Sequence, residues 1–586
     1  MSSNGMRPDI IFRIGGEGGE GVISCGEILT LACARMGLEI YTFRSYPAEI
    51  KGGPAMFQVR TSKEILLSQG SEIDVLVCFN QEAYDRHAKD VRKDGRGVII
   101  YDASSTKPEE GLNAILYSIP VSEMAKMELR NYLTKNIIFL GILSKLFGVD
   151  FSILENIIHQ KFGKKGEAIL NLNFQALKAG FQAIEKNFTK KDDFYFEAQK
   201  NENRLVLSGN QALALGAVQA GMRFYAGYPI TPATDIMELL ARELPRFGGT
   251  VVQAEDEIAA IGMVLGAAFT GVKAMTASSG PGIDLMPEFL GLASMAEVPC
   301  VIVDCQRAGP STGMPTKTEQ SDLRHALSAG HGDAPRIVMA LTSVEDAFYG
   351  IIRAFNYAVR CQMPVIVLTD QYLAQRTATI RKPDMMRVAT EEVLRPSDAD
   401  LEHYKRFRDT PSGVSPITFP GTKGGAYSAT GIEHDEDCEL SYEPANHRKM
   451  TEKRWRKLNL VLQGPDLFRR YGPLDAEIGI VGWGSSEGVI REAVVQANAK
   501  GYHVAAFHPK ILHPMPNELG DFIRSVKTVI VPELNFTGHF AKEIRARYLV
   551  DVVQLNKVAG LPFTPNEILE KIEEVQESCL KHPHKV

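Results

Sequence analysis

Four short apolar runs recur between residues 250 and 370, separated by helix-like segments. They are TVVQAE at 250–255, VKAMTAS at 272–278, CVIVDC at 300–305 and PVIVLTD at 364–370. Strands that are apolar throughout are typical of parallel sheets, because helices cover both faces of such a sheet. The pattern therefore predicts an open α/β sheet, in which ligands bind beyond the carboxyl ends of the strands.

Similar patterns at both ends of the chain predict an α/β protein with three α/β domains. DIIFRIGG at 9–16 leads into a glycine-rich turn and a helix, and EIGIVGWG at 477–484 begins the last unit. A stretch rich in Pro, Gly and Ser predicts an irregular excursion before that unit. The expected boundaries are 1–187 for the first domain, 188–203 for a polar linker, 204–378 for the second domain, 379–470 for the excursion and 471–586 for the third domain.

Composition argues against a nucleic-acid-binding protein and against a membrane protein. The 586 residues carry a formal net charge of −6, which leaves no basic footprint for nucleic acid. No apolar run approaches the roughly 20 residues that span a bilayer, and the N-terminus lacks a secretory pattern, so we expect a cytoplasmic enzyme. The eight cysteines include no Cys-x-x-Cys pair. The sequence therefore predicts no metal site and no iron–sulfur cluster in this chain.

The loop GGEGGEG at 15–21 contains Gly16-x-Gly18-x-x-Gly21 between a predicted strand and a predicted helix. This is the outline of a nicotinamide or flavin dinucleotide site, and Glu39 lies about where a ribose-binding acid would lie. The two glutamates within the loop oppose a pyrophosphate, which is attracted by backbone N–H groups and a positive helix end. Three interpretations stay open: a dinucleotide site, a tight strand–helix turn without a ligand, and a site for another ligand.

Three acidic residues, Glu255, Asp256 and Glu257, stand where a predicted strand turns into the apolar segment IAAIGMVLGAA. Acids at the start of a helix can simply cap it, since they favour the positive end of its dipole. The helix that follows is apolar on every side and is expected to be buried, so an acid at its start faces a crowded interior. Its protonation would then be set by its neighbours, which makes at least one of the three a candidate functional residue.

Three more loops follow predicted strands of the second domain. The elbow YPITP at 228–232 places Thr231 between two prolines, which fix φ at about −65° and make the elbow rigid. SSGPG at 278–282 is a second turn, and Arg307 follows the run CVIVDC. A lone arginine is usually a surface cation, but a guanidinium that emerges from a buried strand suits a substrate carboxylate.

Four motifs in register resemble the α subunit of the 2-oxoacid:ferredoxin oxidoreductases. They are GYPITPATD at 227–235, QAEDEIAAIG at 253–262, TASSGPG at 276–282 and QRAGPSTGMPT at 306–316. The first domain resembles the γ domain of the family through GGEGGEG and SYPAEIKGG, and VGWGSSEG with VPELNFTGHFAKEIR is similar to its last domain. The resemblance covers nearly the whole chain. It implies a γ domain, a thiamine-diphosphate pyrimidine-binding domain and a transketolase C-terminal-like domain.

The resemblance also implies roles for individual residues. Glu257 matches the carboxylate that binds N1′ of the thiamine aminopyrimidine, Thr231 matches a hydroxyl that contacts cofactor and substrate, and Arg307 matches a cation that holds the 1-carboxylate of the substrate. The remaining implied cofactor contacts are Tyr228, Pro229, Ile230, Ser278, Ser279 and Gly280, and the implied coenzyme A contacts are Gly16, Gly18, Gly19, Gly21, Ser45 and Lys51. Glutamates in the glycine loop, and Lys51 in place of an arginine, depart from the family pattern.

Two parts of such an enzyme are missing from the sequence. A Gly-Asp-Gly…Asn stretch would hold Mg²⁺ on the diphosphate, and the chain contains no Gly-Asp-Gly. Four closely spaced cysteines would hold a [4Fe–4S] cluster, and the eight cysteines of the chain are scattered. The resemblance therefore implies a separate β subunit that carries both, in an (αβ)2 heterotetramer that uses coenzyme A and ferredoxin. The γ–α order favours 2-oxoglutarate as the substrate, with pyruvate and branched-chain 2-oxoacids as alternatives. An NAD- or FAD-dependent oxidoreductase and a non-catalytic scaffold subunit are the alternatives of other classes.

Overall fold

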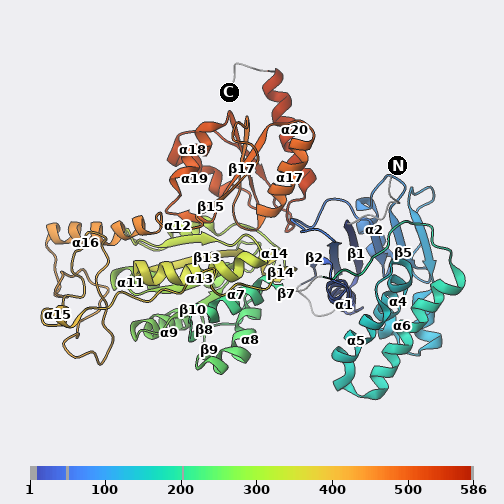
Figure 1. Ribbon diagram of the computed structural model, residues 1–586, viewed down its shortest axis with the longest axis horizontal. Helices are drawn as coiled ribbons and strands as arrows, with labels where there is room; N and C mark the ends of the chain where they lie inside the picture. The colour runs from blue at the N-terminus through green and yellow to red at the C-terminus, as the bar shows by residue number, and fades with distance from the viewer. Residues whose placement is uncertain (1–8, 48–51, 201–202, 582–586) are drawn as a thin grey trace. The chain divides into compact units, whose positions relative to one another are not determined.

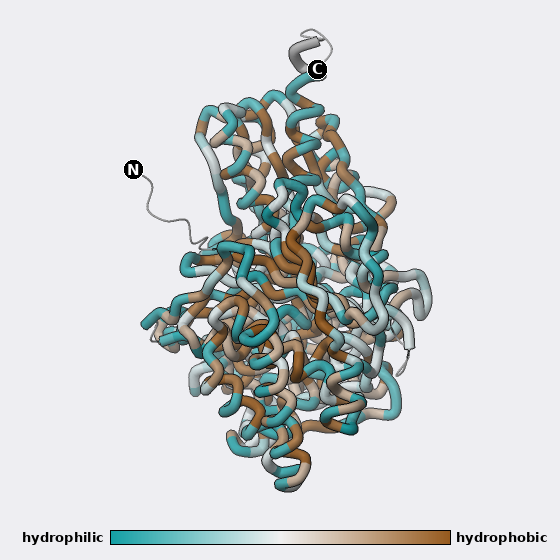
Figure 2. Tube along the Cα trace, turned by 90° about the vertical axis from the view of Figure 1, so that its right-hand side faces the viewer, coloured by the Kyte–Doolittle hydropathy of each residue, from teal (hydrophilic) through white to brown (hydrophobic). Residues whose placement is uncertain are grey.

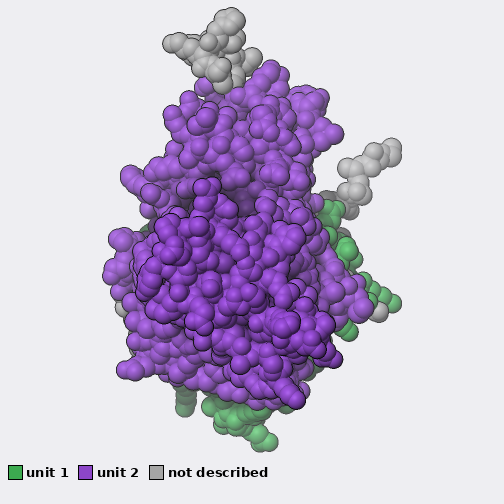
Figure 3. All heavy atoms as spheres, turned by 90° about the vertical axis from the view of Figure 1, so that its left-hand side faces the viewer, with its two compact units in different colours: residues 1–207, 376–382 green, residues 208–375, 383–586 purple. Residues whose placement is uncertain are grey.

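The computed structural model describes residues 9–47, 52–200 and 203–581 and divides into two compact units. The first unit contains residues 1–207 and 376–382, and the second contains 208–375 and 383–586 (Figure 3). The chain therefore leaves the first unit, returns to it for one short segment, and leaves it again. Each unit is an α/β structure, as the sequence predicts.

The first unit is built on a mixed sheet of eight strands among the described residues, in the order β6-β5-β4-β1-β3-β2-β14-β7. β1 pairs in parallel with β4 and antiparallel with β3. The strands are β1 (Asp9–Glu17), β2 (Glu39–Ser45), β3 (Pro54–Ser62), β4 (Val75–Cys78), β5 (Val98–Asp102), β6 (Ile115–Ile119), β7 (Arg204–Ser208) and β14 (Thr377–Arg381). The main helices are α1 (Val22–Arg35), α2 (Gln81–His87), α4 (Lys135–Phe147), α5 (Phe151–Phe162) and α6 (Glu167–Asn187) (Figure 1).

Two segments of this unit lie where the expected domain boundaries do not put them. Phe194 and Phe196, within the stretch 188–203, are buried in the core of the first unit. β14 pairs antiparallel with β2 through Ala378 and Tyr41, so a segment that follows the second domain's strands completes the first sheet. Both contacts join residues distant in sequence, which local composition does not report.

The second unit contains a sheet of seven strands in its described part, in the order β18-β12-β13-β11-β10-β8-β9. All neighbouring strands are parallel except β18, which is antiparallel to β12. The strands are β8 (Phe224–Gly227), β9 (Thr250–Gln253), β10 (Ala274–Ser278), β11 (Cys300–Gln306), β12 (Ile337–Ala340), β13 (Pro364–Asp370) and β18 (Ile511–His513). The helices that precede or follow them are α7 (Gly209–Gln219), α8 (Thr234–Glu243), α9 (Glu257–Phe269), α10 (Gly280–Ile283), α11 (Pro287–Met295), α12 (Leu323–Ser328), α13 (Val344–Cys361) and α14 (Gln371–Gln375).

A smaller sheet of five described strands, in the order β15-β17-β16-β19-β20, belongs to the same unit. Its strands are β15 (Phe468–Tyr471), β16 (Ile478–Val481), β17 (Val504–Pro509), β19 (Thr528–Glu533) and β20 (Val553–Asn556), and its helices are α17 (Glu487–Ala499), α18 (Asn517–Ser525), α19 (His539–Tyr548) and α20 (Pro565–Lys581). Figure 2 shows the apolar residues of the molecule concentrated along inner strands and the polar ones along outer segments. No described helix has the length and apolar character needed to cross a membrane.

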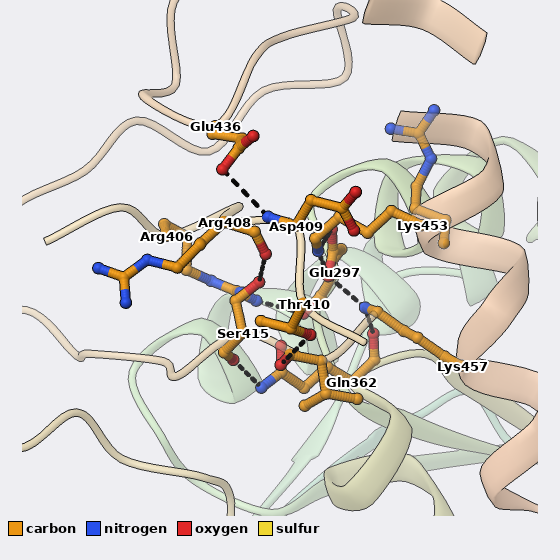
Figure 4. Close-up of polar contacts among 12 residues, drawn as sticks. Glu297, Gln362, Arg406, Arg408, Asp409, Thr410, Ser415, Glu436, Lys453 and Lys457 are labelled. Carbon is orange, nitrogen blue, oxygen red and sulfur yellow. Dashed lines mark hydrogen bonds and ion pairs between the residues drawn. The ribbon is translucent and has the colours of Figure 1, made fainter. Parts of the chain in front are cut away.

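Between the two sheets the chain runs mainly without regular structure from residue 383 until α16 (Pro444–Arg456), with the short α15 (Asp398–Leu401) on the way. A buried ionic cluster attaches this excursion to the end of α11. Both Nζ–carboxylate distances from Lys453 to Glu297 are short, 2.6 and 2.8 Å, and Lys457 also contacts the Glu297 carboxylate. Arg406 donates to the backbone carbonyl of Glu297 at 2.8 Å (Figure 4). All four side chains are buried, so the excursion is attached by charges removed from water.

Candidate active site

The structure separates the three acids at the start of α9 into three environments. Glu255 is exposed. Asp256 is the N-cap of the helix, and its carboxylate accepts from the backbone N–H of Ala259 at 2.8 Å. Glu257 is 5% exposed, and its Oε1 accepts from the Ser278 hydroxyl at 3.0 Å. The capping explanation therefore accounts for Asp256 and leaves Glu257 as the buried carboxylate.

The SSGPG turn approaches the Glu257 carboxylate closely. A Cβ placed on Gly282 would lie 2.2 Å from Glu257 Oε1 and 2.1 Å from Ser278 Oγ, so only glycine fits there. Ser279 is fully buried, and its hydroxyl has no hydrogen-bond partner among the described residues. A buried hydroxyl without a partner costs free energy, which marks this turn as a place where a ligand could complete the hydrogen bonding.

The YPITP elbow and Arg307 are in direct contact. Arg307 Nη1 donates to the backbone carbonyl of Thr231 at 2.7 Å, and Nη2 donates to the carbonyl of Thr312 at 3.2 Å. Asn210, which is buried, donates to the carbonyl of Pro232 at 2.8 Å and fixes the other side of the elbow. Tyr228 is exposed, whereas Pro229, Ile230 and Thr231 are half-buried. The elbow thus positions a guanidinium through main-chain oxygens.

Arg307 is a buried cation without a carboxylate partner in the part of the chain that the structure describes. Arg307 is 7% exposed. Among the described residues, its Nε has no hydrogen-bond partner and its guanidinium forms no ion pair. Burial lowers the pKa of Arg307 and the nearby Asp322 opposes that effect. A desolvated guanidinium of this kind has room to bind a carboxylate brought by a ligand.

Arg307 lines a cavity of about 550 Å³ at the carboxyl ends of β10 and β11. The polar side chains of its wall come from several loops and helices: Asp284, Arg307, Ser311, Glu319, Ser321, Asp322, His325, Asn535, Thr537 and His539. Gly280 of the SSGPG turn and the exposed Phe536 complete it. Three of the sequence-predicted loops therefore converge: the elbow contacts Arg307, and Arg307 and the SSGPG turn line the cavity.

Two carboxyl groups near this cavity were missed by the sequence reasoning. Asp304 lies on β11 beside Ser278 of β10, and both of its carboxylate oxygens are buried without a hydrogen-bond partner among the described residues. Asp322 lines the cavity, and its Oδ2 is also buried and has no hydrogen-bond partner within the described ranges. They are the first and last residues of the stretch DCQRAGPSTGMPTKTEQSD, from which only Arg307 was singled out. The sequence signal of Asp304 is an acid within an apolar strand, whereas Asp322 precedes α12 and looks like an ordinary helix cap.

The glycine loop of the first unit is occupied by its own contacts. Gly18 N–H donates to the carbonyl of Gly53 at 2.9 Å, and Gly52 N–H donates back to the carbonyl of Gly18 at 3.2 Å. A Cβ on Gly18 would lie 2.7 Å from the Gly52 carbonyl oxygen, so this close approach requires glycine. The structure therefore joins the two motifs, GGEGGEG and SYPAEIKGG, that carry the resemblance of this domain.

Of the two glutamates in that loop, Glu20 has a largely buried side chain. Glu20 accepts from the backbone N–H of Glu17 at 2.9 Å, from Asn80 Nδ2 at 2.9 Å and from the Tyr132 hydroxyl at 3.1 Å, and it lies 3.6 Å from the buried Lys135. The N–H groups of Glu17 and Gly18 are thus used within the protein, which removes support for a dinucleotide pyrophosphate there. Of the other proposed coenzyme A contacts, Ser45 ends β2, and Lys51 lies outside the described residues.

Comparison with known proteins agrees with this geometry. Three family models match: pyruvate ferredoxin/flavodoxin oxidoreductase at residues 11–183, pyruvate flavodoxin/ferredoxin oxidoreductase, thiamine diphosphate-binding, at 215–453, and pyruvate:ferredoxin oxidoreductase core domain II at 476–568. The 2-oxoglutarate oxidoreductase subunit KorA of Mycobacterium tuberculosis is 34% identical, over 96% of this chain and 90% of that protein. This chain belongs to the 2-oxoacid:ferredoxin oxidoreductases.

Further relatives of this oxidoreductase point to the same subunit. The 2-oxoacid:ferredoxin oxidoreductase subunit alpha of a Sulfolobus species is 33% identical over 96% of both chains. A solved structure of 2-oxoglutarate:ferredoxin oxidoreductase from Magnetococcus marinus, with 2-oxoglutarate, coenzyme A and succinyl-CoA bound, is 43% identical. It superposes with a TM-score of 0.92 and covers 97% of this chain and 99% of its own. The chain is therefore an α subunit with the γ–α order, and the predicted fold class is confirmed.

Proposed function

We propose that this α subunit acts on 2-oxoglutarate, and that Arg307 holds the 1-carboxylate of the substrate. The complete enzyme converts the 2-oxoacid and coenzyme A to acyl-CoA and CO2, with ferredoxin as the electron acceptor, and it can run in reverse. The observation that carries the proposal is the buried guanidinium of Arg307, which faces a cavity and has no carboxylate partner among the described residues. A scaffold subunit would have no use for such an unpaired charge, since burying it costs free energy.

The choice of 2-oxoglutarate rests on the relatives. The Magnetococcus marinus enzyme, whose name and bound ligands include 2-oxoglutarate, shares 43% identity with this chain over nearly its full length. The Mycobacterium tuberculosis relative is also a 2-oxoglutarate oxidoreductase. The Sulfolobus and Aeropyrum pernix relatives named for 2-oxoacids in general are 33% and 29% identical, so pyruvate and branched-chain 2-oxoacids are the alternatives with weaker support.

Glu257 is proposed to bind N1′ of the aminopyrimidine of thiamine diphosphate. The residues around the start of α9 and the SSGPG turn fit that group: one Glu257 oxygen accepts from Ser278, the Ser279 hydroxyl has no partner among the described residues, and Gly282 leaves space that a Cβ would fill. When bound, thiamine diphosphate supplies the carbon nucleophile for 2-oxoacid decarboxylation. Glu257 would hold or move the proton at N1′, in a site from which its burial excludes water.

The elbow is proposed to orient both ligands. Its backbone carbonyl at Thr231 fixes Arg307, and the half-buried Thr231 side chain is proposed to contact cofactor and substrate, as the resemblance implies. Tyr228, Pro229, Ile230 and Gly280 remain proposed cofactor contacts. A rigid donor group contributes to catalysis because it needs no reorganisation when charge develops.

A β subunit is proposed to cover the outer face of α9 and to bring the diphosphate-binding half, its Mg²⁺ and a [4Fe–4S] cluster. After Glu257 the sequence of α9 contains no charged residue, yet Ile258 and Met263 are 46% and 41% exposed. No atom outside the helix lies within 4 Å of a Cβ built on Gly266. An exposed apolar helix face next to a half-site is typical of a subunit interface. An (αβ)2 tetramer is the assembly we propose.

Coenzyme A is proposed to contact the glycine loop of the first unit, through Gly16, Gly18, Gly19, Gly21, Ser45 and Lys51. The loop is held in place by backbone hydrogen bonds of Gly18 with Gly52 and Gly53, and by the contact of Glu20 with the buried Lys135. The domain boundaries 1–187, 204–378 and 471–586, with the linker 188–203 and the excursion 379–470, are likewise proposed for this chain.

The test is turnover of the complex formed with the β subunit, measured as 2-oxoglutarate-dependent dye reduction in the presence of coenzyme A. Glu257→Gln should lower kcat by about 10²–10⁴-fold, the range for loss of a group that holds a proton in the transition state. Glu255→Gln is the matched control, since it changes an exposed acid two residues away, and it should retain near-normal kcat.

Two further arms use the same assay. The α chain without its partner should show no turnover, and activity without the β subunit would contradict the divided site. Ser45→Ala should raise the KM for coenzyme A and leave the KM for 2-oxoglutarate unchanged. If Glu257→Gln retains near-normal kcat, the assignment of the cofactor-binding carboxylate is wrong.

A further inference from the structure

The carboxyl group of Asp322 has no role in the function proposed so far, yet it lies in the same cavity as Arg307. Its backbone N–H donates to Gln306 Oε1 at 3.2 Å, which fixes the main chain. A Cβ built on Gly280 would lie 3.3 Å from Asp322 Oδ2, so the carboxyl group faces the SSGPG turn, where glycine leaves room for it. Oδ2 is buried and has no hydrogen-bond partner among the described residues.

Asp322 does not neutralise Arg307 directly. The Nη1 and Nη2 groups of Arg307 donate to main-chain carbonyls of Thr231 and Thr312. The cation and the carboxyl group therefore line one cavity, and each has a polar atom without a hydrogen-bond partner in the described part of the chain. A ligand with an acceptor group between them could satisfy both.

The charges around Asp322 favour its neutral form. Other acids and bases face it from the neighbouring strand, loops and helices: Asp304, Asp284, Glu319, Arg307, His325 and His539. Of the acids, Asp284 is 2.8 Å from His325, whereas Asp304 has no partner among the described residues. Burial, with the Asp284 and Glu319 carboxylates next in size, raises the pKa of Asp322 to about 7, although Arg307 opposes this.

An anionic substrate makes the protonation state matter. 2-Oxoglutarate carries two negative charges, and a cavity wall with every carboxyl group ionised would repel it. A neutral carboxylic acid removes that repulsion and also becomes a hydrogen-bond donor, which a carboxylate is not.

We propose that Asp322 binds the substrate as a neutral carboxylic acid, and that its O–H donates to the 1-carboxylate that Arg307 also holds. The inference rests on the proposed function, because it takes the 1-carboxylate of a 2-oxoacid as the ligand of this cavity. It adds a second substrate-binding residue and a dependence of substrate affinity on pH. Ionisation of Asp322 removes the donor and adds a negative charge next to the substrate.

The test is the KM for 2-oxoglutarate in the assembled enzyme between pH 6 and 8.5. In the wild type, KM should be nearly constant below pH 7 and should rise above it, by at most about tenfold per pH unit, as expected for one ionisation. Asp322→Asn keeps the shape and a hydrogen-bond donor but cannot ionise. Its KM at pH 6 should be close to that of the wild type, and the rise above pH 7 should disappear.

Two more variants sharpen the result. Asp284→Asn removes the acid that, after burial, raises the pKa of Asp322 most, so Asp322 should ionise more readily and the rise in KM should move to lower pH. Glu288→Gln changes an exposed acid of α11 and should reproduce the wild-type profile. Copurification of each variant with the β subunit serves as the folding control.

A wild-type KM that does not rise above pH 7 overturns the proposal without any variant. A wild-type-like rise in Asp322→Asn also overturns it, because the titrating group would then lie elsewhere. Arg307→Ala separates this inference from the proposed function. If Arg307→Ala raises KM while Asp322→Asn changes nothing, only the role of Asp322 is wrong, whereas an unchanged KM in Arg307→Ala rejects the substrate site itself.

Discussion

Glu297 and Asp322 are both acids in buried surroundings within the second unit, and their environments differ in kind. The Glu297 carboxylate forms ion pairs with Lys453 and Lys457, and Arg406 donates to its backbone carbonyl. Its negative charge is therefore compensated by cations of the excursion (Figure 4). Asp322 stands among other acids, and its Oδ2 lacks a partner among the described residues. A buried charge that is fully paired contributes to structure, whereas one left without a partner costs stability and is typical of a functional site.

The pKa directions express the same contrast. Burial would raise the pKa of Glu297, but Lys453 and Lys457 hold it well below its usual value. For Asp322, burial and two neighbouring acids act together and raise the pKa to about 7. The protein therefore keeps Glu297 ionised and favours the neutral form of Asp322 below neutral pH.

The largest effect on structure is expected for Glu297→Gln, which leaves two buried lysines without their carboxylate. Removing one partner of a buried ion pair costs about 3–5 kcal/mol. The thermal unfolding midpoint should fall, and protease cleavage within 383–443 should become faster, because this cluster attaches the excursion. Glu452→Gln is the control: it breaks an exposed pair with Arg448, which contributes little to stability because water screens it.

A compensating variant strengthens this test. Adding Lys457→Met to Glu297→Gln removes one of the unpaired cations, so part of the lost stability should return. If Glu297→Gln is no less stable than Glu452→Gln, the cluster does not attach the excursion and the contrast with Asp322 fails.

Removing the unpaired cation of the cavity should affect function more than stability. Arg307→Ala should lower kcat/KM for 2-oxoglutarate by about 10- to 100-fold, since a charge-assisted hydrogen bond is worth about 1.5–3 kcal/mol. Arg307→Lys keeps the charge but loses the planar pair of donors, and it should restore only part of the activity. Arg242→Ala, which changes an exposed arginine of α8, is the control. Unchanged kinetics in Arg307→Ala with every 2-oxoacid tested would make Arg307 an ordinary structural cation.

The sequence was sufficient for the architecture and for the positions of the loops at the strand ends. Apolar strands bury themselves whatever surrounds them, so TVVQAE and CVIVDC identify β9 and β11 from local composition. The return of β14 to the first sheet could not be predicted, because a strand's partner is fixed by contacts far away in sequence.

The candidate site was predicted in part for the same reason. Glu257 stands out because an acid begins an apolar helix, and Arg307 because it follows a buried strand. Asp322 follows a polar loop and resembles a helix cap, and only the fold shows that its Oδ2 has no hydrogen-bond partner among the residues described. Lys453 and Lys457 lie in the stretch HRKMTEKRWRK, whose many basic residues suggest a solvent-exposed helix. Lysines are rarely buried unless they are paired, so the sequence does not indicate that these two are buried.

The smallest expected effect has the opposite sign to that of Glu297→Gln. The pKa of Asp322 in the folded protein is about 7, above its value of 3.8 as an ordinary aspartate. As the pH rises from 4 to 7, the unfolded chain releases this proton while the folded chain keeps it, so the wild type loses stability across that range. Asp322→Asn cannot ionise and escapes this loss. Its unfolding midpoint should exceed that of the wild type by on the order of 2 °C at pH 8, and by less at pH 5. Measuring both proteins at both pH values decides the matter, since an Asp322→Asn midpoint below the wild type at pH 8 would show that this carboxyl group is paired and structural, as Glu297 is.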